Sequence, residues 1–468
     1  MIKTKKKLIP FYKEIIGDLD TPVSVFLKIN EKNSFLLESV TGGEYLARYS
    51  IIGCDPFCVL TADSEKVSVT LENETCQSDT NPITALEDLL NTFSIDSYPE
   101  LPRFIGGAVG FFSWEIIGKI EKIHFRDKTP SPLPLAHFLF PRILVIFDHV
   151  KRKIIIVAWA FPETESQALQ RIEMIEKRIR TPLPKLFFNF NSFSGDPFHK
   201  TTSNYDKELF QKAVIQVKQS IFEGDVFQLV LSQKFQIESQ RHPFEVYRRL
   251  RSLNPSPYMF YFDLRDYHII GTSPEILVRL DHDKAILRPI AGTRPRLENA
   301  DEDMIQSLLS DEKEKAEHIM LVDLGRNDLG RVCQFGTVKT NSLMEIEKYS
   351  HILHMVSNIE GNLAKGKTAF DLFKATFPAG TVSGAPKIRA IELIDELEPE
   401  ARGLYAGALG YFDFRGNMDL CITIRTILNW NKRYYVQAGA GIVADSDPER
   451  EYDETCNKAK GMLLACME

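Results

Sequence analysis

Apolar residues recur with helical spacing near the start of the second half of the chain. They are Phe210, Ala213, Val214, Val217 and Ile221. Positions i, i+3, i+4, i+7 and i+11 predict an amphipathic helix, and Gly224 suits the left-handed position just beyond its end. The segment 226–235, VFQLVLSQKF, follows at once and has the composition of a β-strand.

Shorter apolar runs separated by turn signals occupy much of the remaining chain. In the segment 142–160, two β-branched runs flank DHVKRK, which predicts a β-hairpin rather than a membrane span. Four further strands are expected at 259–263, 268–271, 276–281 and 284–290. Because hairpin-linked strands and helices mix in both halves, the pattern favours the α+β class, with antiparallel β-sheets and flanking helices, over a doubly wound parallel fold.

The 468-residue chain is longer than a typical domain, so a division into two domains is expected. A helical pattern at 163–180 ends at TPLPK, where two prolines stop it. We therefore predict an N-terminal domain at 1–180, a connector at 181–203 and a C-terminal domain at 204–468.

Composition narrows the functional class. Apolar residues make up 44% of the chain and charged residues 26%, as in ordinary soluble globular proteins, and the net charge of −7 disfavours a general nucleic-acid binder. The seven cysteines include no CxxC motif, which favours reduced thiols in the cytoplasm over disulfides or zinc. No apolar segment follows the basic start, so no signal peptide is expected.

Acidic residues stand at helical spacing in DEKEKAEH, 311–318. Glu314 and Glu317 are i, i+3 neighbours, and their face continues into Leu321 and Leu324. Charge runs usually form solvated helix faces. A solvated face should not run into an apolar stripe, however, so we interpret this pair as pointing inward.

A second acidic stripe follows near the C-terminus. Asp447 fits an N-cap and Pro448 a first helical position, which places Glu451, Glu454 and Lys458 on one face. The alternative is a charged helix start that complements the helix dipole. Two ExxE helices can supply an oxygen-rich site suited to Mg²⁺, which takes a few carboxylates and keeps water for substrate.

Two glycine-containing loops stand beside predicted elements. PAGTVSGAPK, 378–387, leads into a helix, and free backbone N–H groups at such an end can bind anions. In QAGAGIVADSD, 437–447, glycines would let a ligand approach the backbone. Tight turns are the alternative for both loops.

Three more polar residues stand in apolar surroundings. YSHILH contains His351 and His354, for which zinc binding, general-base chemistry and an ordinary structural role all remain open. Arg425 lies in the apolar strand pattern CITIRT, where a lone guanidinium needs an anionic partner.

Four segments together resemble one enzyme family. They are PIAGTRPR (289–296), DEKEKAEHIMLVDLGRND (311–328), PAGTVSGAPK (378–387) and AGAGIVADSDPEREYDETCNKA (438–459). In this order they are similar to the chorismate-utilising enzymes, most closely to anthranilate synthase large subunits, over residues 20–466. The resemblance implies Mg²⁺-dependent conversion of chorismate and ammonia to anthranilate and pyruvate, the first committed step of tryptophan biosynthesis.

The resemblance also implies roles for individual residues. Mg²⁺ would be held directly by Glu317 and Glu454, with Glu314 and Glu451 acting directly or through waters. Glu275 matches the acid that protonates the departing 4-hydroxyl, and His354, rather than His351, matches the histidine of the later elimination. The groups expected to bind the substrate carboxylate or lie against its ring are Gly292, Thr293, Thr381, Tyr405, Arg425, Gly439, Ala440, Gly441 and Lys458. Thr381 is also counted with the catalytic residues.

Two positions distinguish the branches of this family. Isochorismate and salicylate synthases carry a lysine where this chain has Gln228, and most aminodeoxychorismate synthases carry one where it has Ala291. Both lysines are absent, so the resemblance implies an imported nucleophile, ammonia. The alternatives are aminodeoxychorismate synthase component I and a non-catalytic binding protein on the same scaffold, which the retained ExxE motifs disfavour.

The resemblance implies two further ligands. No cysteine here has the context of an amidotransferase nucleophile, so ammonia would come from a separate glutamine amidotransferase subunit. LLES (36–39) and NPSPYMF (254–260) resemble the family's tryptophan feedback pocket. That pocket would include Glu38, Ser39, Pro255, Tyr258 and Met259; plain packing is the alternative.

Overall fold

The computed structural model describes residues 5–39, 48–184, 195–295, 301–348 and 352–467. The strands up to residue 160 are β1 (Lys6–Lys7), β2 (Ile9–Ile16), β3 (Ser34–Glu38), β4 (Tyr49–Ala62), β5 (Val67–Leu71), β6 (Glu74–Ser78), β7 (Phe93–Ser94), β8 (Gly107–Phe112), β9 (Ala136–Asp148) and β10 (Lys153–Ala160). The helices of the chain up to residue 180 are α1 (Pro22–Ile29), α3 (Pro82–Thr92) and α4 (Glu165–Ile179), with short 3₁₀ turns η1 (Trp114–Lys119) and η2 (Pro162–Thr164).

The remaining strands are β11 (Thr201–Ser203), β12 (Gln228–Glu238), β13 (Tyr258–Asp263), β14 (Tyr267–Ser273), β15 (Ile276–Asp281), β16 (Lys284–Leu287), β17 (Ile290–Pro295), β18 (Lys339–Lys348), β19 (Ile352–Asn362), β20 (Gly384–Ala385), β21 (Ala408–Asp413), β22 (Met418–Ile422), β23 (Thr426–Trp430) and β24 (Arg433–Ile442). The helices are α5 (Lys207–Phe222), α6 (Pro243–Leu253), α7 (Asp301–Ser310), α8 (Glu312–Gly330), α9 (Ala369–Thr376), α10 (Lys387–Leu397) and α11 (Pro448–Cys466), with 3₁₀ turns η3 (Pro197–Lys200) and η4 (Gly380–Val382).

Most predicted elements are confirmed because their signals are local. The amphipathic pattern after residue 206 forms α5, and Gly224 follows its C-cap with a φ of +85°. Strands β9 and β10 form the predicted hairpin, and α4 covers the helical pattern that precedes TPLPK. The run 284–290, expected as one strand, is divided between β16 and β17.

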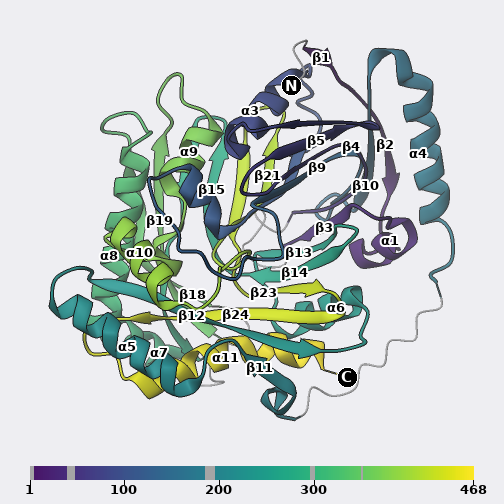
Figure 1. Ribbon diagram of the computed structural model, residues 1–468. Helices are drawn as coiled ribbons and strands as arrows, with labels where there is room; N and C mark the ends of the chain where they lie inside the picture. The colour runs from purple at the N-terminus through teal and green to yellow at the C-terminus, as the bar shows by residue number, and fades with distance from the viewer. Residues whose placement is uncertain (1–4, 40–47, 185–194, 296–300, 349–351, 468) are drawn as a thin grey trace.

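Apart from β1 and β7, which form a short parallel pair, the strands form antiparallel sheets that share β4 and β9 (Figure 1). One branch has the order β2–β10–β9–β4–β3–β13–β14–β23–β24–β12–β11. The other has the order β9–β8–β21–β22–β15–β16–β19, with β17 and β18 also paired to β19. A bulge between Pro56 and Cys58 interrupts the β4–β9 ladder. Because a bulge redirects a strand, it allows β4 to pass from one branch to the other.

Strands from the two predicted domains pair directly with each other. β3 pairs with β13 and β8 pairs with β21, so the sheets cross the expected boundary. Within the expected connector, Thr201–Ser203 forms β11 against β12. The domain division at 181–203 stays a prediction, and both halves contribute to the same sheets.

Two apolar clusters make up the core. The larger contains inward side chains of both sheet branches, such as Phe111, Phe138, Leu277 and Phe412. The smaller lies between the first branch and the helices α1, α4, α6 and α11. The β-sheets and flanking helices therefore confirm the predicted α+β class.

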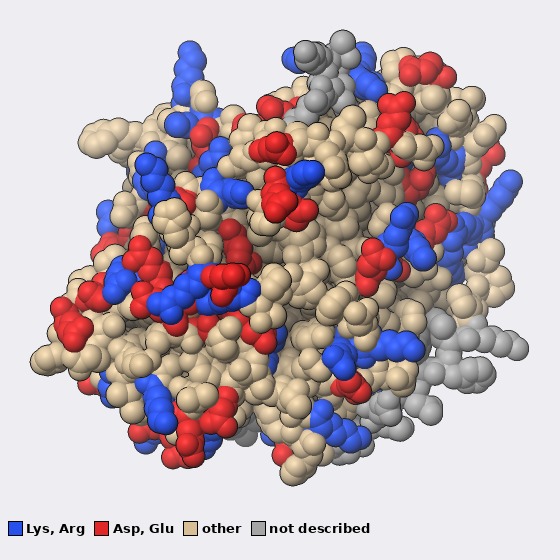
Figure 2. Space-filling model, in the orientation of Figure 1, with Lys and Arg blue, Asp and Glu red and all other residues tan. Residues whose placement is uncertain are grey.

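The surface matches the mixed composition of the chain. Figure 2 shows acidic and basic side chains interspersed over the face seen in Figure 1, rather than gathered into a single basic patch. Among the helices of the described residues, none combines the length and the apolar content needed to cross a membrane.

An aromatic ring covers a strand glycine at a position that can be tested. Phe260 on β13 pairs with Gly271 on β14, and a Cβ at Gly271 would lie 2.2 Å from the Phe260 ring. Because this ring is buried, we expect Gly271→Ala to lower the free energy of unfolding by about 1–3 kcal/mol in urea titrations. Gly461→Ala is the control: this α11 position has open space, so its unfolding free energy should stay or rise by up to about 1 kcal/mol. Equal effects would contradict the packing argument.

Candidate active site

The glycine loop 437–447 forms one wall of the candidate site, because its first half is strand β24. Gly439, Ala440 and Gly441 lie opposite residues 230–232 of β12. A Cβ at Gly439 would lie 2.7 Å from the Tyr405 hydroxyl, and one at Gly441 would lie 2.7 Å from the Gln228 amide. These two glycines therefore let polar side chains approach the strand closely.

Helix α11 brings the second acidic stripe to this wall. The Asp447 side chain accepts hydrogen bonds from the first-turn amides, and Pro448 occupies the first turn, which confirms the predicted helix start. Lys458 Nζ donates to the Gly439 carbonyl at 2.9 Å and to Glu454 at 2.6 Å. Lys458 therefore links the glycine wall to the acidic stripe.

Helix α8 supplies the first acidic pair. The Asp311 side chain caps the helix, and the Gln228 amide donates to Glu317 at 3.0 Å. Glu314 instead pairs with Arg294 at 2.9 Å, and Arg294 also pairs with Asp311 at 2.7 Å. Sequence reasoning missed Arg294; its place two residues after Gly292 in PIAGTRPR was the available signal.

The acidic side chains lie close enough to affect one another. Burial raises the pKa of Glu317; the Gln228 hydrogen bond opposes this shift, and the Glu314 and Glu454 carboxylates add to it. Burial likewise raises the pKa of Glu451, against a hydrogen bond from Ser446. Within the described residues, no three His, Cys, Asp or Glu side chains already stand as a metal-binding group. The four glutamates thus lie near one another without forming a metal-binding group, and each carboxylate has a hydrogen-bond or ion-pair partner in the protein.

Arg425 does not lie inside a strand as expected. It lies between β22 and β23 with a φ of +50°, a left-handed conformation that interrupts the apolar pattern. Burial lowers its pKa, while Tyr405 and Glu454 raise it. Burial raises the pKa of Tyr405 to about 12, so its hydroxyl stays protonated and can donate. Within the described residues Arg425 has no carboxylate partner at ion-pair distance, which leaves its charge available to an anion.

His354 lies on β19 beside the predicted ring-binding residues of β17. It pairs in register with Thr293, whose side chain, like all of His351, lies outside the described residues. Burial lowers the pKa of His354; a hydrogen bond to the Gly292 backbone raises it and Arg425 lowers it further. The imidazole is therefore neutral near pH 7. Gly292 has a φ of +77°, and a Cβ there would lie 3.1 Å from Glu314.

Glu275 lies at the turn between β14 and β15 and is 7% exposed. Burial raises the pKa of its carboxyl to about 8, against the smaller opposing effects of Thr381, the Ile290 N–H and Lys458. Glu275 and Thr381 line a small cavity of about 50 Å³. A carboxyl that is largely protonated at neutral pH can act as a general acid.

A larger cavity of about 1080 Å³ adjoins the same turn. Its wall includes Pro274 and Ile276, the two neighbours of Glu275. The segments LLES and NPSPYMF meet here because β3 pairs with β13, with Glu38 opposite Met259. Four of the five predicted pocket residues line it: Glu38, Ser39, Tyr258 and Met259. Pro255 is not among the lining residues, whereas Pro257, two residues further along the chain, is.

The predicted catalytic, substrate and metal residues thus come together from nine separate parts of the chain. Lys458 touches Gly439 and Glu454, and its charge acts on both Glu317 and Glu275. Gln228 joins α8 to β12, whereas Ala291 on β17 is 9% exposed and offers no functional group. The arrangement combines a buried acid, a neutral base, and donors for an anion.

The buried Glu275 carboxyl predicts a specific pH dependence of stability. Between its ordinary pKa of 4.5 and its folded pKa of about 8, the unfolded chain ionises here while the folded chain keeps the proton. The folded state holds more protons in this window, so stability from this group is full below pH 4.5 and is lost as pH rises through 8. We expect the free energy of unfolding of wild type to fall relative to Glu275→Gln across this range, measured by urea titration. A constant difference would contradict it.

Comparison with known proteins agrees with this geometry. Residues 32–464 match the family described as chorismate binding enzyme. Anthranilate synthase component 1 of Acetivibrio thermocellus is 46% identical over 98% of this chain and 96% of its own length. The crystal structure of anthranilate synthase component I from Streptococcus pneumoniae superimposes with a TM-score of 0.81 at 38% identity, covering 96% of this chain and 99% of that one.

A more distant structure shares the fold alone. The menaquinone-specific isochorismate synthase of Escherichia coli superimposes with a TM-score of 0.75 at 19% identity, covering 99% of this chain and 96% of that one. The similarity therefore extends over nearly the whole chain and includes both sheet branches. The chain belongs to the chorismate binding enzyme family, in the group whose named relatives are anthranilate synthase component 1 proteins.

Proposed function

We propose that this chain is the chorismate-converting component of an anthranilate synthase. The observation that carries this proposal is the near full-length similarity to component 1 proteins, together with a site that has no amine at either of two decisive positions. The reaction is chorismate plus ammonia giving anthranilate, pyruvate and water. Each step below uses groups that this chain supplies.

The nucleophile distinguishes this reaction from its relatives. Gln228 has no basic group, and its amide is already bonded to Glu317 at 3.0 Å, so it cannot activate a water. Ala291 carries no amine that could attack the ring. The nucleophile must therefore enter from outside, and ammonia is the small neutral nucleophile whose addition yields an amino product.

The first chemical step replaces the 4-hydroxyl. Glu275 donates its proton so that the hydroxyl leaves as water while ammonia forms the new bond at C2. Arg425, Lys458 and the Gly439–Gly441 backbone surround the predicted carboxylate position with positive charge and N–H groups, which stabilise bound anion in a site shielded from water. Glu275 is suited to this role because burial keeps it protonated.

The second step makes the ring aromatic. The C2 proton leaves to a base, and the enolpyruvyl group departs and gains a proton to become pyruvate. His354 is the proposed base, since its imidazole is buried and neutral and contacts the Gly292 backbone beside the expected ring position. The product retains the nitrogen that was added at C2 in the first step.

We propose Mg²⁺ as the cofactor, held by Glu317 and Glu454 with Glu314 and Glu451 beside them. Carboxylate oxygens are the ligands this ion prefers. Burial raises the pKa of Glu317 and the Glu314 and Glu454 carboxylates add to the rise, an effect that a cation would offset. On binding the ion, Glu454 would give up its ion pair with Lys458, and Glu317 would give up its hydrogen bond from Gln228. Bound there, Mg²⁺ would supply positive charge to hold the substrate carboxylate.

A second component would deliver the ammonia. The relatives are named component 1, and none of the cysteines here has the sequence context of an amidotransferase nucleophile. Burial raises the pKa of Cys54 and Cys58 to about 12 and of Cys333 to about 11, which suppresses their thiolates. We therefore propose a separate glutamine amidotransferase subunit, with free ammonium able to replace it at alkaline pH.

The proposal predicts product formation by the purified chain alone. With chorismate, Mg²⁺ and ammonium at alkaline pH, we expect anthranilate fluorescence from wild type and none after EDTA treatment. Glu317→Gln should lower kcat/KM by about 100-fold or more, because it removes one charged group from the electrostatic centre of the site.

Glu312→Gln is the matched control for that variant. Glu312 is on the same helix, but its side chain is 86% exposed and, among the described residues, pairs with Lys315 alone, so turnover should be kept. Folded wild type without anthranilate would refute the function. An aminodeoxychorismate or isochorismate product on chromatography would show that Ala291 or Gln228 had been misinterpreted.

We also propose that the large cavity binds L-tryptophan as an inhibitor. Its size and mixed apolar and charged lining suit an amino acid with an aromatic side chain. Ser39→Leu should fill one end, abolish inhibition by tryptophan and keep uninhibited turnover. Assays with L-phenylalanine provide the specificity control. Unchanged tryptophan inhibition in Ser39→Leu would exclude this cavity as the inhibitor site.

A further inference from the structure

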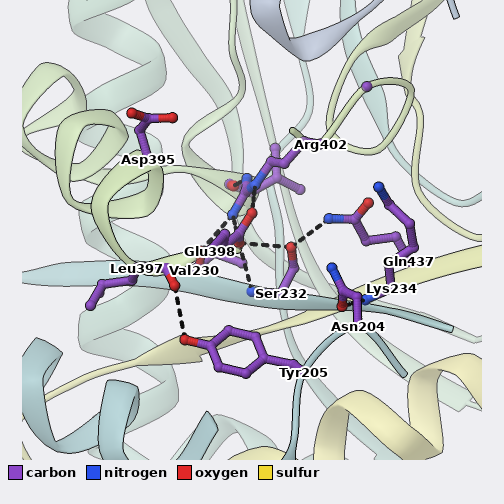
Figure 3. Close-up of polar contacts among 12 residues, drawn as sticks. Asn204, Tyr205, Val230, Ser232, Lys234, Asp395, Leu397, Glu398, Arg402 and Gln437 are labelled. Carbon is purple, nitrogen blue, oxygen red and sulfur yellow. Dashed lines mark hydrogen bonds and ion pairs between the residues drawn. The ribbon is translucent and has the colours of Figure 1, made fainter. Parts of the chain in front are cut away.

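A fully buried ion pair lies directly behind the candidate active site. Arg402 donates from Nε to Glu398 at 2.9 Å and from a terminal nitrogen to its other oxygen at 2.7 Å. The side chains are only 1% and 3% exposed, respectively. Figure 3 shows the Arg402 guanidinium directed at Glu398, while Asp395 lies apart from them. None of the chemistry described above uses this pair.

The pair joins two segments that carry residues of the candidate site. Arg402 donates to the Val230 carbonyl on β12 at 2.7 Å and to the Val382 carbonyl of η4 at 2.7 Å. Val230 lies two residues after Gln228, and Val382 immediately follows Thr381. One guanidinium therefore fixes the distance between the β12 end of the site and its η4 loop.

Glu398 extends the link to the glycine wall. Its Oε1 accepts from the Ser232 N–H at 2.8 Å and from the Ser232 hydroxyl at 2.7 Å. The Gln437 amide of β24 donates to the same hydroxyl at 2.8 Å, two residues before Gly439 (Figure 3). The network thus connects the helix end to both strands that frame the site.

The guanidinium also supports an aromatic residue of the site. It stacks on the Trp114 ring at 4.4 Å and lies 5.4 Å from the Tyr405 ring. The segment from Leu397 to Ala401, which includes Glu398, is hydrogen-bonded at both ends. The Tyr205 hydroxyl donates to the Leu397 carbonyl at 2.9 Å, and Lys234 donates to the Ala401 carbonyl at 3.1 Å. Tyr405 is therefore held from one side by Arg402 and faces Gly439 on the other.

Burying two charges is costly, and apolar residues of similar volume often give equal or greater stability. A pair whose bonds end on β12, at Val230 and Ser232, and on η4 does something that apolar packing cannot: it holds two other backbone segments at hydrogen-bond distances from the end of α10. We propose that Arg402 and Glu398 are positioning residues that set the spacing of Thr381, Tyr405 and the Gly439–Gly441 wall. The inference rests on the proposed function for where the substrate carboxylate binds.

Arg402→Lys tests this role while keeping the charge. Lysine cannot reach Glu398, Val230 and Val382 together, because its donors radiate from one atom. With ammonium as nitrogen source, we expect kcat/KM for chorismate to fall about 100-fold, mainly through KM, with KM for ammonium unchanged. Kinetics are measured well below the melting temperature of each variant, so that loss of fold does not contribute.

Asp395→Asn is the matched control, on helix α10, whose C-cap is Glu398. Asp395 is also buried and paired, with Lys128 at 3.0 Å, but its side-chain bonds in the described structure go to Lys128 and the Arg126 amide. It should lower the melting temperature and leave KM for chorismate within about twofold of wild type. An Arg402→Lys variant that changed KM no more than this control, or changed both KM values equally, would overturn the proposal.

Ser232→Ala keeps the test decisive if Arg402→Lys does not fold. It removes only the hydroxyl between Glu398 and Gln437, so the fold should survive and KM for chorismate should rise in the same direction, by less. An unchanged KM in Ser232→Ala would also count against the proposal. Turnover by wild type in the same assay separates this result from failure of the proposed function itself.

Discussion

The ladder between β12 and β24 is the constraint on which the site depends. It places Gln228 at the start of one strand beside Gly441 near the end of the other, and it brings α11 to the glycine wall through Lys458. Antiparallel pairing fixes register because a slip by one residue would send every side chain to the opposite face. The same ladder thus determines which backbone groups are free to meet a ligand.

Charge is the second organising feature, and the structure balances it locally. Four glutamates from two helices face the same region, yet Gln228, Arg294, Ser446 and Lys458 each satisfy one of them. Without these partners, bringing the carboxylates together away from water would destabilise the folded state. Each glutamate therefore keeps a hydrogen-bond or ion-pair partner within the protein, which a bound cation could replace.

Local signals in the sequence predicted much of this architecture. The starts of α8 and α11, the hairpin β9–β10 and the end of α5 follow from caps, prolines and apolar spacing within a few residues. The motif resemblance supplied the candidate site residues, many of which lie on β17, α8, η4, β24 and α11. Features that depend on distant pairing were not predictable in this way: β3 against β13 joins residues more than two hundred positions apart.

The misses share the same physical origin. Arg294 and Arg402 act through partners on other elements, and nothing in their neighbouring residues specifies which carboxylate they will meet. Arg425 was expected in a strand because apolar residues flank it, but its left-handed backbone conformation is imposed by the packing around it. The spacing of apolar residues indicates which positions are buried, but it does not indicate the single residue at which the chain turns.

The turn that carries Glu275 has a consequence for how the two cavities are related. Pro274 lines the large cavity, Glu275 lines the small one, and Ile276 lines both, so the two cavities meet at a single stretch of three residues. The two cavities therefore share part of their walls, and the proposed proton donor, Glu275, belongs to the shared stretch. A ligand in the large cavity would contact the immediate neighbours of Glu275 directly.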